Sequence, residues 1–261
     1  MIESRSNPRV VALRKLDNRK HRREAGLLLA EGTPIIETAL AAGAIPAEAW
    51  VAPELQDDAA RTLLARLEEA GATVVEVSSG VMETLAEREP PQGLLATFPL
   101  PRASWETLRL GSSDLVVVVD RLQDPGNVGA LIRTAAAVGA AAVVLIAPCA
   151  DPFDPKAVRG SMGSVFQTPI IESDDPASAI APLRSAGLRI VGADAHEGGD
   201  PRRALAGGVA LLLGNETRGL SPDLAPLAAE RVALPLPGGA ESLNVAVAGG
   251  VLMYCWLWAR G

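Results

Sequence analysis

Cysteine and histidine are scarce in this 261-residue chain, with two of each. Cys149 and Cys255 lie far apart and lack the paired spacing of a zinc or redox motif, so we expect reduced cytosolic thiols. The histidines, His21 and His196, lie outside the three polar segments described below, and His196 is expected to be an ordinary loop residue. No G-x-S-x-G elbow occurs either. The sequence therefore argues against metal chemistry, histidine acid–base chemistry and triad hydrolysis.

We expect neither a signal peptide nor a membrane span. Its first two dozen residues carry charges throughout, with no apolar core of a signal peptide, which argues against secretion. The most apolar run, residues 243 to 259, is shorter than the roughly 20 residues that cross a bilayer and opens next to Asn244. We expect a cytoplasmic protein with no membrane partner, in which this run forms a buried or subunit-interface helix.

Positive charge is concentrated at the N-terminus, although the net charge of the chain is −7. Between Met1 and Glu24, eight arginines and lysines face three acids, a local excess of five. Such a stretch can contact nucleic-acid phosphates, but it can equally be the solvated face of a helix. The side chains that we predict to contact RNA are Arg14, Lys15, Arg19, Lys20, Arg22 and Arg23.

The apolar pattern predicts an α/β protein with a largely parallel sheet and two domains. Apolar strands alternate with alanine-rich helical stretches, and 48% of the residues are hydrophobic. A proline-punctuated stretch over residues 99 to 113 places the boundary, giving domains 1–105 and 106–261. Strands are predicted at 27–32, 49–52, 73–77, 93–98, 115–119, 142–146, near 170, and at 188–193, 209–213 and 231–234. Helices are predicted within 1–24, at 33–42, 57–70, 128–138 and 177–186, as a turn at 156–163, and at the C-terminus.

The first polar segment follows the strand at 115–119 and reads D-R-L-Q-D-P-G-N-V-G-A-L-I-R-T from Asp120 to Thr134. In open α/β sheets, ligands bind beyond the carboxyl ends of strands, where glycines and a helix N-terminus offer free backbone groups. A Rossmann phosphate loop is a minor alternative, because only two glycines are present in a G-x-x-G arrangement. Asn127 and Arg133 could also be an N-cap and an ordinary surface arginine.

Two further polar segments have the same setting. Leu211 to Pro222 reads L-L-L-G-N-E-T-R-G-L-S-P, with a helix expected to begin at Pro222. Leu234 to Val245 reads L-P-L-P-G-G-A-E-S-L-N-V and leads into the terminal helix. In the segment from Leu234 to Val245, Leu234 and Leu236 could enclose an adenine, and Ser242 could cap the helix. Taken singly, the segment from Leu211 to Pro222 could be an ordinary turn, and the segment from Leu234 to Val245 could be a capped loop.

Together, the three segments resemble the SpoU (TrmH-like) branch of the SPOUT RNA methyltransferases. The shared signatures are D-P-x-N-x-G-x-x-x-R-T, G-x-E-x-x-G-L and P-M/L-x-G…S-L-N-V, in order, over most of the chain from Leu115 to the end. The stretches 27–32 and 91–96 resemble a small ribosomal-protein-like RNA-binding domain, more weakly. The resemblance implies a C-terminal α/β trefoil-knot methyltransferase domain, a smaller N-terminal α/β RNA-binding domain, and a homodimer whose sites are completed near the subunit interface.

The resemblance also implies the reaction, which is methyl transfer from S-adenosylmethionine (AdoMet) to a ribose 2′-hydroxyl of RNA, ribosomal RNA rather than tRNA. By family match the catalytic residues are Arg133, Asn127, Glu216, Ser242 and Asn244, and Arg159 binds RNA phosphate. The implied cofactor residues are Leu213, Gly214, Asn215, Glu216, Leu234, Leu236, Ser242, Leu243 and Asn244. Because a guanidinium stays protonated, we expect Arg133 to stabilise the emerging alkoxide rather than to act as a base. The alternative is a catalytically silent RNA-binding protein with the same fold.

Overall fold

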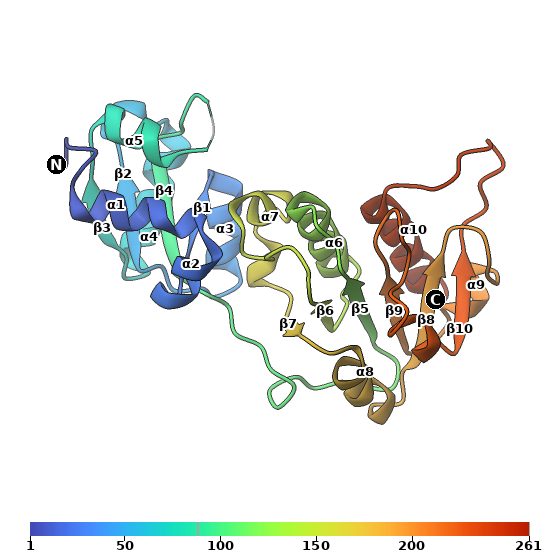
Figure 1. Cartoon of the computed structure of the whole chain (residues 1–261). Helices are drawn as coiled ribbons and strands as arrows, with labels where there is room; N and C mark the ends of the chain where they lie inside the picture. The colour runs from blue at the N-terminus through green and yellow to red at the C-terminus, as the bar shows by residue number, and fades with distance from the viewer. Residues whose placement is uncertain (88, 261) are drawn as a thin grey trace. The chain divides into compact units, whose positions relative to one another are not determined.

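The computed structural model describes residues 1–87 and 89–260. Contacts divide the chain into two compact units, drawn in Figure 1. The first comprises Met1–Pro101 with Phe153–Gln167, and the second Arg102–Pro152 with the chain from Thr168 onward. The segment 153–167, which we expected in the second domain, packs with the N-terminal unit. The roles assigned to domains 1–105 and 106–261 stay predictions.

The N-terminal unit is built on a mixed four-stranded sheet in the order β1-β4-β2-β3. Its strands are β1 (Leu27–Glu31), β2 (Glu48–Val51), β3 (Thr73–Glu76) and β4 (Leu94–Pro99). β4 is antiparallel to both of its neighbours, and β2 is parallel to β3. All four strands coincide with predicted ones. This agreement follows from their short runs of β-branched and apolar residues between turn signals.

Six short helices surround this sheet: α1 (Pro8–Arg14), α2 (Arg19–Ala25), α3 (Thr33–Ala41), α4 (Asp58–Glu69), α5 (Ser79–Leu85) and α7 (Pro155–Gly160). Apolar side chains of α1 and α5 form one core with β2 and β3. Phe166 anchors the segment 153–167, because its ring meets Phe98 of β4 edge to face at 5.1 Å. Gly163 adopts a φ of +85° against α3, where a Cβ would lie 2.8 Å from the Ile35 carbonyl oxygen. Helix α5 had not been predicted.

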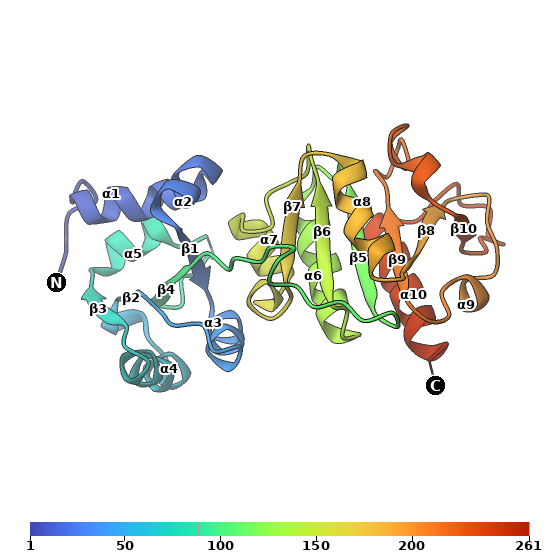
Figure 2. The ribbon, with the colours of Figure 1, turned by 90° about the horizontal axis from the view of Figure 1, so that it is seen from below.

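The second unit contains a six-stranded, fully parallel sheet in the order β10-β8-β9-β5-β6-β7 (Figure 2). Its strands are β5 (Leu115–Asp120), β6 (Ala142–Ile146), β7 (Ile170–Ser173), β8 (Arg189–Asp194), β9 (Val209–Leu213) and β10 (Glu230–Ala233). β5, β6 and β9 are buried along their whole length. Such continuous apolar strands belong to parallel sheets that are covered on both faces. The predicted parallel α/β sheet is confirmed.

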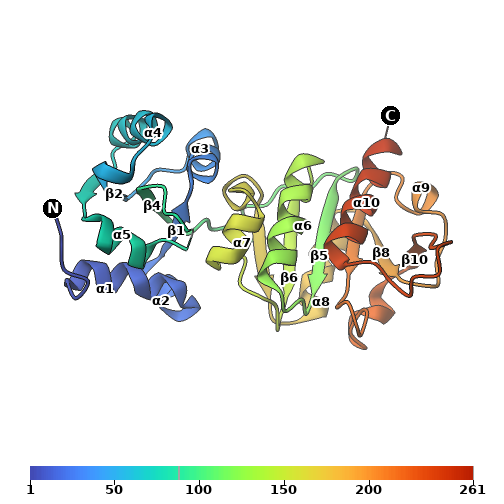
Figure 3. The same cartoon turned by 90° about the horizontal axis from the view of Figure 1, so that it is seen from above.

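Helices cover both faces of this sheet. α6 (Pro125–Ala137) and the terminal helix α10 (Val245–Trp258) pack against each other on one face, and α8 (Pro176–Ser185) covers the other (Figure 3). α10 approaches closely at Gly249, where a Cβ would lie 2.6 Å from Leu131 Cδ2 and 2.7 Å from Leu213 Cδ1. Among the described residues, no helix is long and apolar enough to cross a membrane.

Two smaller helical features complete the second unit. α9 (Pro201–Ala204) is a single turn after β8. The helix expected from Pro222 is only a short 3₁₀ turn at Ala225–Leu227. The trefoil knot stays a prediction.

Candidate active site

A cavity of about 690 Å³ opens at the carboxyl ends of β8, β9 and β10. Parallel strands bring their carboxyl ends to one edge of the sheet, so segments distant in sequence meet there. The cavity is lined by Ala193, Asp194, Ala195, His196, Leu213, Gly214, Asn215, Glu216, Thr217, Arg218, Gly219, Leu220, Ala225, Arg231, Leu234, Leu236, Glu241, Ser242, Leu243, Val245, Ala248 and Leu252. Two of the three polar segments predicted from sequence therefore line one cavity.

The loop after β9 is a tight turn that carries Glu216 near its tip. Asn215 N donates to Gly219 O at 3.0 Å, and Gly219 N donates back to Asn215 O at 2.8 Å. Asn215 Oδ1 accepts the backbone N–H of Thr217 at 3.1 Å. Gly214 has no room for a side chain, because a Cβ would overlap the backbone of Gly219. The loop therefore has one closed shape, which fixes where Glu216 stands.

A chain of side-chain hydrogen bonds connects the three polar segments. Asn127 Nδ2 donates to Glu216 Oε1 at 2.5 Å, and Asn244 Nδ2 donates to Asn127 Oδ1 at 3.1 Å. Asn244 is in turn the N-cap of α10, because its Oδ1 accepts the N–H of Ala246 at 2.9 Å and of Val247 at 3.3 Å. Asn127 and Asn244 do not themselves line the cavity, but Asn127 is hydrogen-bonded to Glu216, which does. The predicted residues Asn127, Glu216 and Asn244 thus form one connected group.

The start of α6 explains the position of Asn127. Asp124 caps this helix by accepting Gly126 N at 2.6 Å, and Pro125 occupies the first helical position. Asn127 therefore lies in the first turn. Arg133 lies nearly two turns later, exposed, and forms no hydrogen bond or ion pair within the described part of the chain. It does not line the cavity, and no hydrogen bond or ion pair joins it to Glu216 within one chain.

The remaining predicted cofactor residues supply the cavity walls. Leu213, at the end of β9, is buried, whereas Leu234 and Leu236 are half-buried on the loop after β10. Leu243 and Ser242 line the cavity from the segment before α10. Ser242 is exposed and makes no hydrogen bond to any other described residue. The cavity therefore has leucine walls and a polar group at Glu216.

Six charged or polar residues of the cavity lining were not assigned to the site from the sequence: Asp194, His196, Thr217, Arg218, Arg231 and Glu241. Asp194 ends β8, and its Oδ2 lies 3.1 Å from Arg231 Nη1 on β10. The N–H of His196 donates to Asp194 Oδ1 and lowers the pKa of that carboxyl group, and Glu197 N–H and Arg231 act in the same direction. The signal was present, because Asp194 follows an apolar strand as the polar segments do. No cluster of three metal-ligating side chains occurs in residues 1–87 and 89–260.

The predicted RNA-contacting residues fall into different environments of the N-terminal unit. Arg14, Lys15, Arg19, Lys20 and Arg23 are exposed. Arg159 forms an ion pair with Glu87.

Arg22 requires a correction. It is only 2% exposed, its Nη1 donates to Leu16 O at 2.6 Å, and its Nη2 lies 3.7 Å from Asp154 Oδ2. A buried guanidinium cannot reach an RNA phosphate, so Arg22 has a structural role. Nearby, burial raises the pKa of Asp17, and the carboxylate of Glu87 adds to that rise.

Two families match the chain, one in each half. The SpoU rRNA Methylase family matches residues 114–254, and the MRM3-like substrate binding domain matches residues 7–96. The first match covers more than half of the chain. Together the two matches follow the predicted order of a small substrate-binding domain and a methyltransferase domain.

Relatives and solved structures agree with these matches. The chain is 34% identical to the 23S rRNA (guanosine(2553)-2′-O)-methyltransferase of Bacillus subtilis, over 97% of each chain. It is 32% identical to the 23S rRNA (uridine(2479)-2′-O)-methyltransferase of Streptomyces viridochromogenes, over 92% of this chain and 85% of that one. The AdoMet-bound rRNA methyltransferase from Sinorhizobium meliloti superposes with a TM-score of 0.86 at 32% identity, over 98% of this chain and 96% of that one. The chain belongs to the SpoU rRNA methylase family.

Proposed function

We propose that this protein transfers a methyl group from AdoMet to a ribose 2′-hydroxyl of ribosomal RNA. The observation that carries this proposal is the hydrogen-bonded chain from Glu216 through Asn127 to Asn244, which stands beside a leucine-walled cavity. The relatives named above are described as acting on 23S rRNA, which favours ribosomal RNA over tRNA. A catalytically silent RNA-binding protein is the alternative, and the connected polar group argues against it.

The cavity suits AdoMet in size and chemistry. Its volume of about 690 Å³ lies within the roughly 300–1,000 Å³ typical of pockets for ligands of this size. Leu213, Leu234 and Leu236 can enclose the adenine, and backbone groups of the Gly214–Gly219 turn face the same space. The cavity carries the carboxylates of Asp194, Glu216 and Glu241 and the guanidiniums of Arg218 and Arg231, which suits a cofactor that bears both positive groups and a carboxylate. We assign the cofactor site to the predicted residues together with Asp194.

The chemistry requires alignment of the 2′-oxygen and removal of one proton. When bound, AdoMet supplies an activated methyl group, so the protein residues need only position the acceptor and stabilise its charge. We assign Asn127 and Asn244 to orienting Glu216, and Glu216 and Ser242 to the cavity edge where the ribose enters. Arg133 stabilises the alkoxide as it forms, because its guanidinium stays cationic, while RNA phosphate or water accepts the proton.

A homodimer explains why Arg133 is unused in one chain. Six residues of α-helix turn the side-chain direction by about 240°, so Asn127 and Arg133 point to different sides of α6. On α10, which packs against α6, Val247, Val251, Tyr254 and Trp258 recur at i, i+4, i+7 and i+11, and all four are exposed. This apolar stripe is a suitable dimer contact. We propose that Arg133 enters the active site of the partner subunit.

The N-terminal unit is proposed to hold the RNA. Exposed Arg14, Lys15, Arg19, Lys20 and Arg23 are suited to phosphate contacts, which would make binding depend on salt. Arg159 remains a candidate for RNA phosphate if its bond to Glu87 is exchanged. Because ribosomal RNA is the proposed substrate and Cys149 and Cys255 form no disulfide with each other, a cytoplasmic location is proposed as well.

The test is methyl transfer from labelled AdoMet into total cellular RNA, separated by size and mapped for 2′-O-methylation. Label in the large ribosomal RNA, lost with Asn127→Ala, is the expected result. Label confined to tRNA would contradict the proposed substrate class. Cofactor binding without label in any RNA, with purified ribosomal subunits also tested as acceptors, would favour the silent RNA-binding alternative.

A further inference from the structure

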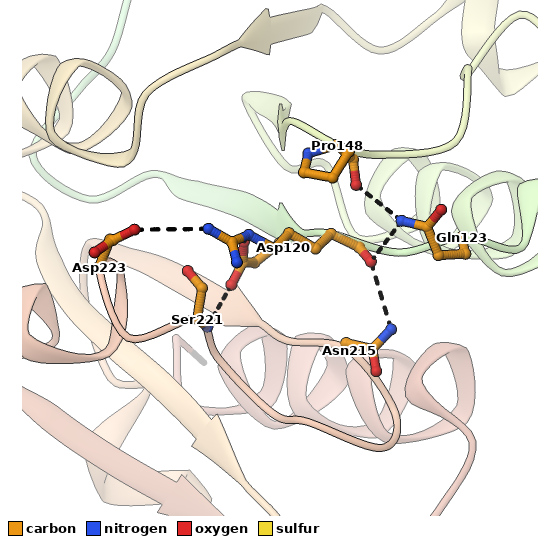
Figure 4. Close-up of polar contacts among 7 residues, drawn as sticks. Asp120, Gln123, Pro148, Asn215, Ser221 and Asp223 are labelled. Carbon is orange, nitrogen blue, oxygen red and sulfur yellow. Dashed lines mark hydrogen bonds and ion pairs between the residues drawn. The ribbon is translucent and has the colours of Figure 1, made fainter.

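The carboxylate of Asp120 is fully buried at the carboxyl end of β5, next to the loop that carries Glu216. Asp120 is 0% exposed, and its Oδ2 accepts the backbone N–H of Ser221 at 2.6 Å (Figure 4). Its other oxygen, Oδ1, accepts no hydrogen bond from the described residues and lies 3.7 Å from Arg121 Nε. Burying a carboxylate is costly unless it is paired. Asp120 is accordingly paired on both sides, with the Arg121 guanidinium at Oδ1 and with the Ser221 backbone N–H at Oδ2.

The next residue, Arg121, holds the other end of the same loop. Its carbonyl oxygen accepts Asn215 Nδ2 at 3.4 Å and Gln123 Nε2 at 3.2 Å, and Gln123 Nε2 also donates to Pro148 O at 2.9 Å. Figure 4 shows Asn215 and Ser221 on one loop, facing the end of β5. Arg121 has a φ of +57°, which non-glycine residues rarely adopt. Its guanidinium lies 3.6 Å from Asp223 Oδ2, just after the loop.

We propose that Asp120 is a positioning residue, which together with the Arg121 carbonyl clamps the loop from Asn215 to Ser221 at both ends. Between these anchors the loop is closed by the paired backbone bonds of Asn215 and Gly219. A closed loop held at both ends keeps one position relative to β5. Because α6 follows β5, the same clamp holds Glu216 within reach of Asn127. Asp120 thereby sets the affinity of the cavity for AdoMet without touching it.

This inference rests on the proposed cofactor site, and the experiment separates the two. The AdoMet dissociation constant is measured by calorimetry for wild type, Asp120→Ala, Asp120→Asn and Asp114→Ala, with the melting temperature of each. Asp114 precedes β5 at its opposite end, where its Oδ2 accepts Gly111 N at 2.7 Å. It is the matched control, because it loses the same kind of carboxylate-to-backbone bond far from the loop.

The clamp predicts a defined pattern. Asp120→Ala raises the AdoMet dissociation constant about tenfold or more, because a hydrogen bond to a charged group is lost and the loop is released. Asp120→Asn stays within about threefold of wild type, because its amide oxygen still accepts Ser221 N. Asp114→Ala lowers the melting temperature but leaves the dissociation constant unchanged. A role in stability alone predicts equal effects for the two alanine variants.

Three results would overturn the clamp: unchanged affinity in folded Asp120→Ala, equal loss in Asp114→Ala, or no rescue by asparagine. If Asp120→Ala does not fold, Asn215→Ala is compared with Thr217→Ala: both residues line the cavity, but only the Asn215 side chain anchors the other end of the loop. Wild-type affinity in Asn215→Ala, or an equal loss in Thr217→Ala, contradicts the clamp. A wild-type protein that binds no AdoMet contradicts the proposed cofactor site itself.

Discussion

Arg133 is the residue whose proposed role depends most on a second subunit, and a mixing experiment tests it. Replacing Arg133 by alanine removes an exposed guanidinium that contacts no other described residue. The fold should therefore be unaffected, and the affinity for AdoMet should change by less than about twofold, because Arg133 does not line the cavity. Turnover should fall about 10²- to 10³-fold, the usual cost of losing one donor to a developing oxyanion.

The expected recovery follows from the position of the residues. Asn127 contacts Glu216 of its own chain, whereas Arg133 is proposed to serve the partner. A dimer of one Arg133→Ala chain and one Asn127→Ala chain then has one site with both residues intact and one site with neither. Such heterodimers should show about half of the wild-type turnover, and an equal unselected mixture about one quarter, because half of its dimers are mixed.

The two variants are made with different affinity tags, co-expressed and purified over both tags, so that only heterodimers are assayed. Methyl transfer from labelled AdoMet to ribosomal RNA is compared with both mutant homodimers and with tagged wild type. Arg203→Ala is the matched control, because it removes an exposed guanidinium from α9 that, like that of Arg133, forms no hydrogen bond or ion pair with the described residues. Heterodimers as inactive as the two homodimers would refute the assignment of Arg133 to the partner site.

Three further predictions concern the amide chain, the dimer and the N-terminal unit. Asn244→Asp keeps the cap of α10 but removes the donor to Asn127. The free energy of unfolding should therefore change by less than about 0.5 kcal/mol, while kcat falls at least about tenfold. A loss of stability as large as the loss of kcat would contradict separate roles for the cap and for the bond to Asn127. Val251→Arg places a charge in the apolar stripe of α10. The variant should sediment as a monomer and lose methyl transfer. A variant that stays dimeric would exclude this interface. Asp17→Asn should raise the melting temperature at pH 7. The pKa of Asp17 is higher in the folded state than in the unfolded state, where it is near 3.8. Above the folded-state pKa the ionised carboxylate destabilises the fold, and below about 3.8 this destabilisation is absent. The gain should therefore disappear as pH falls toward 3.8, and a gain independent of pH would contradict burial of the charge as its cause.

Much of the fold could be predicted because the signals are local. β5 and β9 are continuous apolar runs of strand length, and α6 begins where Asp124 and Pro125 form a capped first turn. That Asn127, Glu216 and Asn244 lie together could also be predicted, since polar residues that follow parallel strands meet at one edge of the sheet. Asp194 was missed although it follows the same rule. The helix expected at Pro222 is only a short turn, because Pro226, four residues later, lacks the backbone N–H that a helix needs.

By itself, the sequence determined the parallel α/β class and the order of the strands along the chain, because backbone preference and apolar periodicity act over a few residues. Only the tertiary structure decided that Arg22 is buried, that the segment 153–167 packs with the N-terminal unit, and that Asp120 bonds Ser221. These outcomes depend on partners far away in the sequence, such as Asp154 for Arg22 and Ser221 for Asp120. Charge and spacing along a chain do not say which side of a helix or strand end faces the core, because that side is chosen by packing.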